Sequence, residues 1–153
     1  MLTFNENLIA FDLDAPDVET VINVLAQKLY EQDLVTADYG EQVLAREQKH
    51  PTGLPTRPFP IAFPHADAEG VHHSALAVAL LRTPIVFQSM EDPDEGLAVQ
   101  IVFMLANKSP EEQIDTLRNL ALLFGQPEKL SELHLLFSTQ EILHWLQQEL
   151  NLH

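Results

Sequence analysis

One histidine stands in a stretch of backbone that fixes its direction. His65 ends the run Ile61-Ala62-Phe63-Pro64-His65, and Pro64 restricts the chain immediately before it. A nucleophile needs one orientation, whereas an ordinary surface histidine does not. We therefore take His65 as the candidate nucleophile. The competing interpretation is a loop histidine that hydrogen-bonds a backbone group.

Residues upstream of His65 are of types that hold anions. The planar guanidinium of Arg46 can bind two phosphate oxygens at once, and the Thr52 hydroxyl or the Gly53 amide can add a donor. Together with the histidine, these groups indicate transfer of an anionic group. Taken alone, Arg46 is more simply explained as a cation in the last turn of a helix, where it interacts favourably with the helix dipole.

Other titratable side chains are weaker candidates. Asp67 is placed to orient the His65 imidazole or to act with it in hydrolysis, although no Gly-x-Ser-x-Gly elbow or phosphate-binding glycine loop accompanies it. His72 and His73 are adjacent and would point to opposite faces of a strand, which favours a surface loop over a metal site. His50 lies beside the proline-rich loop. We expect neither a metal nor a cofactor.

Composition excludes several classes of protein. The 153 residues are 46% hydrophobic and 20% charged, as in a folded globular protein, and we expect one domain over residues 1–153. The absence of cysteine excludes disulfides, thiolate nucleophiles and iron–sulfur clusters. A net charge of −15 disfavours binding to nucleic acid or to anionic membrane surfaces. Apolar runs reach roughly nine residues and no basic leader opens the chain, so we expect a soluble cytoplasmic protein.

The helices and strands that position these residues are predicted from the spacing of apolar residues and from residues that begin or end such elements. Residues 8–13 form a candidate strand, and Asp17 precedes a helix with apolar residues at helical spacing. A second helix over about residues 37–48 places Arg46 in its last turn. Residues 51–65 contain five of the ten prolines, which excludes a helix or a central strand and predicts an ordered loop or rigid extended segment.

The middle of the chain changes to strand periodicity. Ala75–Leu81 and Ala98–Ala106 are apolar on both alternating faces, which is typical of strands covered on both sides. Thr83–Phe87 is a candidate short strand between them, and Glu91–Gly96 is an acidic turn.

The last third is predicted to be helical. Ser109-Pro110-Glu111-Glu112 has the pattern of a capping box, and Gly125 is placed to end the helix that follows. Residues 130–136 suggest a short helix, and Ser138-Thr139-Gln140-Glu141 caps another. This order of elements predicts an α/β fold. In the helix that follows Ser109, the apolar stripe is expected to be Ile114, Leu117, Ala121 and Phe124.

Three motifs together resemble the enzyme IIA domains of the sugar phosphotransferase system, fructose/mannitol class. They are Arg46-Glu47, then Pro51-Thr52-Gly53-Leu54, then the apolar trio that ends in Pro64-His65. The turn His50-Pro51-Thr52-Gly53 and the course of the chain beyond it are most similar to the galactitol-type members. The resemblance spans nearly the whole chain.

The resemblance implies a cytoplasmic phosphoryl carrier with a mixed β-sheet of about five strands flanked by helices on both faces. In such a carrier His65 would accept a phosphoryl group from the phosphocarrier protein HPr. It would pass the group to a cysteine of the cognate enzyme IIB, which phosphorylates sugar entering through the membrane-bound IIC. Galactitol is the sugar that the subtype suggests. A homo-oligomer is compatible with the sequence.

The resemblance also assigns residues around His65. Arg46, Thr52 and Gln113 would stabilise the phosphoryl group. Many relatives of the mannitol and fructose types have a second histidine where this chain has Gln113, which can donate a hydrogen bond but cannot titrate. The residues expected to surround the site are Glu47, His50, Gly53 and Pro64.

Two alternatives accompany this interpretation. One is a regulatory protein of the same fold, similar to the nitrogen-related IIA proteins, which signals by its phosphorylation state. The other, from a different class, is a hydrolase built on His65 and Asp67, which would turn over an ester and form no stable phosphohistidine.

Overall fold

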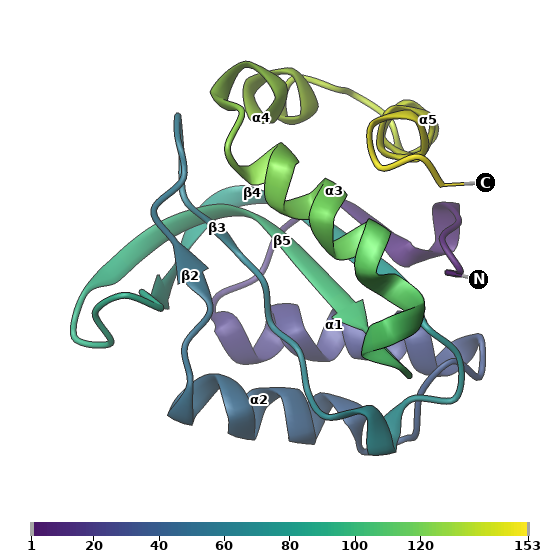
Figure 1. The fold of residues 1–153 in the computed structure, drawn as a ribbon. Helices are drawn as coiled ribbons and strands as arrows, with labels where there is room; N and C mark the ends of the chain where they lie inside the picture. Colours follow the sequence, from purple (N-terminus) through teal and green to yellow (C-terminus); the bar gives the residue numbers. More distant parts are fainter. Residues whose placement is uncertain (1, 153) are drawn as a thin grey trace.

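The computed structural model describes residues 2–152 and has a mixed five-stranded sheet in the order β1-β4-β5-β3-β2 (Figure 1). Strand β1 runs parallel to β4, β4 antiparallel to β5, β5 parallel to β3, and β3 antiparallel to β2. The mixed sheet that the sequence predicts is therefore confirmed. The strands are β1 (Ile9–Leu13), β2 (Gly53–Leu54), β3 (Ile61–Ala62), β4 (Ala75–Gln88) and β5 (Gly96–Ala106).

Helices cover both faces of this sheet. Figure 1 shows the first two helices on one side and the last three on the other, as the sequence predicts. Within residues 2–152, no helix combines the length and the apolar character that a bilayer crossing requires. The helices are α1 (Val18–Glu31), α2 (Tyr39–Lys49), α3 (Ile114–Phe124), α4 (Pro127–His134) and α5 (Thr139–Glu149).

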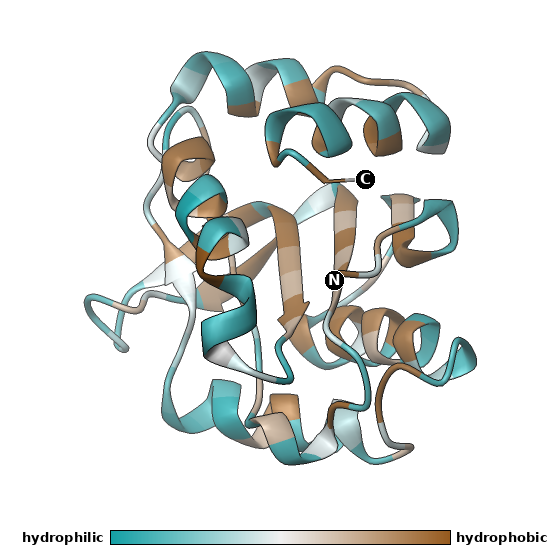
Figure 2. Ribbon diagram, turned by 45° about the vertical axis from the view of Figure 1, so that its right-hand side comes forward, coloured by the Kyte–Doolittle hydropathy of each residue, from teal (hydrophilic) through white to brown (hydrophobic). Residues whose placement is uncertain are grey.

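The core lies along the hairpin of β4 and β5. The first seven residues of β4 and the last six of β5 are buried, because helices cover both faces of the sheet there. Figure 2 shows these strands as hydrophobic along most of their length, whereas the helices are hydrophobic on one face only. The apolar runs of the sequence therefore mark the centre of the fold correctly.

The prediction of a separate strand over Thr83–Phe87 is wrong, because β4 continues through this segment. The pairing of β4 with β5 shifts register between Leu80 and Ile85. Pro84 lies within that irregular stretch, so its missing N–H interrupts no regular ladder.

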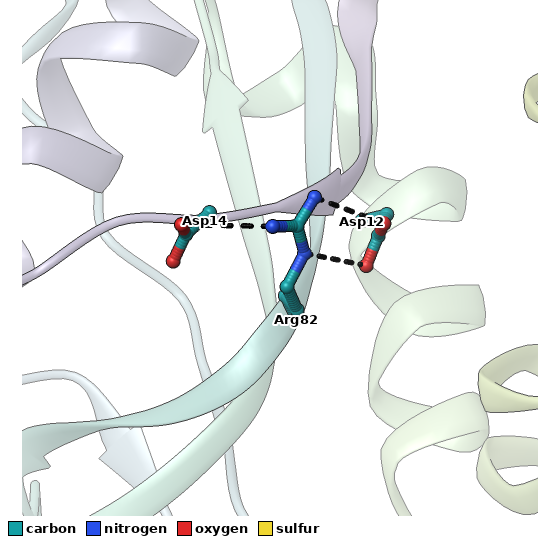
Figure 3. A network of polar contacts seen from close by, with 3 residues as sticks. All are labelled: Asp12, Asp14 and Arg82. Carbon is teal, nitrogen blue, oxygen red and sulfur yellow. Dashed lines mark hydrogen bonds and ion pairs between the residues drawn. The ribbon is translucent and has the colours of Figure 1, made fainter.

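An ion-pair cluster joins β1 to β4 where both strands are irregular (Figure 3). The Arg82 guanidinium donates to both carboxylate oxygens of Asp12, at 3.3 and 3.2 Å, and lies 3.6 Å from Asp14. Asp12 has a φ of 53°, a left-handed conformation that aspartate tolerates better than most residues. Asp12 therefore turns the end of β1 while its carboxylate stays paired with β4.

The proline-rich segment contains an interior strand, contrary to the prediction. Strand β3 pairs with β5 on one side and β2 on the other, in spite of the surrounding prolines. Neither Ile61 nor Ala62 is a proline, and Pro60 contributes only its carbonyl, which accepts from Gln100 N at 3.1 Å. The prolines flank the paired residues, so the two-residue strand keeps its donors.

Helix α3 buries a different stripe from the predicted one. Thr116, Leu120 and Leu123 are buried, whereas Ile114 is 53% exposed. A 3-10 turn over Pro110–Gln113 precedes the α-helix and moves its start to Ile114. The buried face, which continues from Gln113 through Thr116, Leu120 and Leu123, is displaced by one residue from the predicted stripe. Of the predicted stripe, Leu117 and Phe124 are partly buried and Ala121 is exposed.

The two predicted helix caps have different outcomes. Ser138 accepts a hydrogen bond from Glu141 N at 3.1 Å and caps α5, as expected. Ser109 makes no such bond, and its hydroxyl donates to the Glu111 carboxylate at 2.7 Å. The predicted capping box at Ser109 is therefore wrong.

This contrast predicts different stability effects at two serines. We expect Ser138→Ala to lower the free energy of unfolding by about 1 kcal/mol, because it removes a side-chain cap. Ser109→Ala is its control and should change that energy by less than about 0.5 kcal/mol. Urea unfolding followed by the fluorescence of Trp145, which lies on α5, measures both. Equal losses for the two variants would contradict the assignment of the caps.

Candidate functional site

The site begins where β3 leaves the sheet. The chain continues from Ala62 into Phe63, Pro64 and His65, with Pro64 buried and His65 half-buried. The His65 Nδ1 atom lies 3.0 Å from the carbonyl oxygen of Phe63. Because a carbonyl only accepts, the proton of the neutral imidazole belongs on Nδ1. The Nε2 atom then carries the free electron pair that a nucleophile needs.

A buried acid and a buried hydroxyl lie behind this segment. Glu47, in the last turn of α2, is 7% exposed, and Thr52 is 2% exposed. One oxygen of the Glu47 carboxylate accepts from Thr52 N at 2.9 Å, and the other accepts from Thr52 Oγ1 at 2.7 Å. Burial raises the pKa of the Glu47 carboxyl, against the opposing effects of the Thr52 hydrogen bonds and the charge of His65.

The Thr52 hydroxyl connects this acid to the His65 segment. Thr52 Oγ1 accepts from Phe63 N at 3.2 Å while its own proton goes to Glu47. A hydroxyl has one proton, so none is left for a phosphate oxygen. The role expected from the sequence, direct donation to phosphate, does not fit this geometry.

Arg46 also reaches the segment, through Asp67. Its Nη1 atom donates to Asp67 Oδ1 at 3.0 Å, and the side chains are 37% and 81% exposed. Asp67 therefore pairs with Arg46, and the carbonyl of Phe63 takes the orienting role that the sequence suggested for Asp67. The pair brings the last turn of α2 beside the residues that follow His65.

The remaining candidates lie in different surroundings. Gln113 is 3% exposed and precedes α3, where its Oε1 accepts from Thr116 Oγ1 at 3.2 Å. That bond leaves the amide nitrogen of Gln113 free to donate elsewhere. Among the hydrogen bonds of residues 2–152, none joins Gln113 to His65. His50 is exposed at the end of α2.

Gly53 is required by a close approach of two chains. A Cβ atom at this position would lie 2.6 Å from the carbonyl oxygen of Gln88, where the turn after Thr52 meets β4. Any other residue would push these segments apart. Gly53 therefore keeps Thr52 in place; a direct contact with a ligand is not needed to explain it.

The contribution of Phe63 was not predicted from the sequence. Its carbonyl orients His65, and its ring lies 5.9 Å from the imidazole and 5.9 Å from the ring of Phe124 on α3. Every residue has the same backbone carbonyl, so residue types do not show which carbonyl will orient a side chain. The one usable signal was the position before proline, which confines Phe63 to extended conformations.

The adjacent histidines lie away from this cluster. His72 and His73 are both exposed, and His72 Nδ1 lies 3.4 Å from the Asp33 carboxylate. Within residues 2–152, no three histidine or acidic side chains are grouped as metal ligands would be.

Comparisons with known proteins agree on one family. The model of the family described as "Phosphoenolpyruvate-dependent sugar phosphotransferase system, EIIA 2" matches residues 2–149. The galactitol-specific EIIA component of Escherichia coli K12 is 30% identical over 126 residues, which cover 81% of this chain and 82% of that protein.

Solved structures share the fold. The nitrogen regulatory protein IIA-Ntr from Neisseria meningitidis has a TM-score of 0.75 and 27% identity, covering 93% of this chain and 94% of that one. The mannitol enzyme IIA of Escherichia coli, solved in a complex with phosphorylated enzyme IIB, has a TM-score of 0.76 and 20% identity. That match covers 97% of this chain and 99% of the other.

The geometry predicts the tautomer of His65. We expect the neutral imidazole to be protonated at Nδ1, because Phe63 presents a carbonyl to that atom. Nitrogen NMR spectra of the native protein and of His65→Ala identify the signals and the protonated atom. His144, exposed on α5, serves as the internal comparison. A proton on Nε2 of His65 would contradict the assignment.

The raised pKa of Glu47 predicts a pH dependence of stability. The folded protein binds this proton more tightly than the unfolded chain, so Glu47 contributes most to stability below its ordinary pKa of 4.5. The contribution is lost as the pH rises through the raised pKa of the folded state. We expect the unfolding free energy of the native protein, relative to Glu47→Gln, to fall as the pH rises above about 4.5.

Urea unfolding over about pH 4 to 8 tests this dependence. Glu41→Gln, an exposed glutamate on the same helix, is the matched control. A difference between the native protein and Glu47→Gln that does not vary with pH would contradict the prediction.

Proposed function

Because the chain belongs to the EIIA 2 family of the phosphoenolpyruvate-dependent sugar phosphotransferase system, we propose that its His65 carries the phosphoryl group. In this proposal His65 receives the group from phospho-HPr and passes it to the cysteine of a cognate enzyme IIB. The observation that carries the proposal is the hydrogen bond from His65 Nδ1 to the carbonyl of Phe63, at 3.0 Å. It leaves Nε2 as the free nucleophilic atom.

The transfer needs positioning and charge compensation more than proton movement. The electron pair of Nε2 forms a bond to phosphorus as the bond between phosphorus and the donor breaks. The imidazole keeps its Nδ1 proton throughout, and the Phe63 carbonyl accepts from it while the ring becomes cationic. No proton has to leave His65 during this step.

Two side chains are proposed to receive the added negative charge. Arg46 is near enough to pair with Asp67, two residues beyond His65, and that exposed ion pair is weak enough to be exchanged for a phosphate. Gln113 has an unused amide nitrogen at the start of α3, where the helix dipole also favours anions. In this role it donates a hydrogen bond and does not titrate.

Similarity to named proteins supports the partner and the sugar. The mannitol enzyme IIA that shares this fold was solved with phosphorylated enzyme IIB, which supports a IIB partner. The galactitol-specific relatives support galactitol, or a similar sugar alcohol, as the substrate of the complete transporter.

A regulatory role is the second candidate. The fold similarity to IIA-Ntr from Neisseria meningitidis supports a protein that signals through its phosphorylation state. A hydrolase has less support, because Asp67 pairs with Arg46 and the hydrogen bond of the imidazole goes to the carbonyl of Phe63.

Incubation with phosphoenolpyruvate, enzyme I and HPr, followed by intact-mass measurement, tests the carrier function. We expect one acid-labile phosphoryl group on the native protein and on His144→Ala, and none on His65→Ala. The exposed His144 is the matched histidine control. Absence of added mass on the folded native protein, with a known IIA phosphorylated in parallel, would refute the proposal.

Addition of galactitol-type enzyme IIB to the phosphorylated protein separates transport from regulation. Transfer to the IIB cysteine supports the transport role. A stable phosphohistidine in the presence of active IIB favours the regulatory role.

A further inference from the structure

A continuous series of hydrogen bonds runs from Glu47 to His65. Glu47 Oε1 accepts from Thr52 Oγ1 at 2.7 Å, Thr52 Oγ1 accepts from Phe63 N at 3.2 Å, and Phe63 O accepts from His65 Nδ1 at 3.0 Å. We propose that Glu47 is a positioning residue for His65, acting through Thr52 and the backbone of Phe63. This inference rests on the proposed role of His65 as the phosphoryl acceptor.

The direction of each bond in the series is fixed by Glu47. A carboxylate only accepts, so the Thr52 hydroxyl must give its single proton to Glu47. The lone pairs of that hydroxyl are then available for the N–H of Phe63. Without the carboxylate, the hydroxyl can rotate, and its proton can face the same N–H.

The backbone transmits this restraint over a short distance. The N–H and the carbonyl of Phe63 lie on either side of its Cα, and the residue before a proline is confined to extended conformations. Pro64 adds a fixed φ. Holding the N–H of Phe63 therefore limits the directions that its carbonyl can take. Thr52 holds that N–H twice, because the Thr52 carbonyl also accepts from it at 3.3 Å.

The burial of Glu47 is difficult to explain by stability alone. A carboxylate that is 7% exposed loses most of its hydration, and its raised pKa reflects that loss. An apolar side chain at this place in α2 would carry no such penalty. The buried carboxylate is accounted for if its hydrogen bonds are needed to orient the reacting residue.

This positioning determines which nitrogen of His65 is free. When Phe63 O accepts from Nδ1, the nucleophile is Nε2. When that carbonyl is displaced, the imidazole is free to take the other tautomer, and Nε2 then carries a proton and cannot attack phosphorus. Loss of the restraint should therefore lower the rate of phosphoryl acceptance without weakening the docking of HPr.

The test compares Glu47→Gln and Thr52→Val with the conservative variant Thr52→Ser and the surface control Glu41→Gln. In the first two we expect nitrogen NMR to report a mixture of His65 tautomers. We also expect acceptance from saturating phospho-HPr to slow about tenfold, with KM within about twofold of the native value. Thr52→Ser keeps the hydroxyl and should behave as the native protein, as should Glu41→Gln.

The outcomes separate positioning from a purely structural role. The proposal is overturned if folded Glu47→Gln and Thr52→Val both keep a single Nδ1–H tautomer and the native rate. These variants break the series at different points, so a folding failure of one leaves the other to decide. The tautomer measurement needs no phosphoryl donor. A tautomer shift in a protein that never accepts phosphate would therefore support the positioning and refute only the proposed function.

Discussion

The arrangement of the site depends on one short pairing, between β3 and β5. Only two residues pair, Ile61 with Ile101 and Ala62 with Val102, but β5 is among the most buried strands of the protein. Because the strands are parallel, the chain beyond Ala62 leaves the sheet at the same edge as the chain beyond β5. That exit brings the backbone of Phe63 beside Thr52 and its ring beside α3.

Charge is distributed unevenly around this exit. The protein carries a net charge of −15, and the most buried acid beside the His65 segment is Glu47. Its carboxylate accepts from two neutral donors of Thr52, and within residues 2–152 it takes part in no ion pair. The guanidinium of Arg46 is paired through Nη1 with the exposed Asp67, whereas its Nε atom is buried. Glu47 therefore holds the buried backbone of the site, while Arg46 lies at the boundary between the site and the solvent.

Elements with local signals could be predicted from the sequence, and those that depend on distant partners could not. Ser138 capped its helix and Gly125 ended another because capping involves only near neighbours in the chain. Strand β3 was missed because two residues acquire strand geometry only from β5, about forty positions away. The motifs indicated His65 and Arg46 as site residues, and their roles stay predictions. The hydroxyl of Thr52 was misassigned because only the fold reveals where its proton goes.

The prolines around His65 have a consequence for how firmly a transferred group can be held. Residues 51–64 include five prolines, one of them directly before His65, and each removes a backbone N–H. Cradles for phosphate are usually built from consecutive N–H groups, and Pro64, directly before His65, contributes none. In the proposed carrier, the grip on the group therefore falls mainly to the side chains of Arg46 and Gln113. A loose grip suits an intermediary in a relay, because a residue that bound the group tightly would trap it.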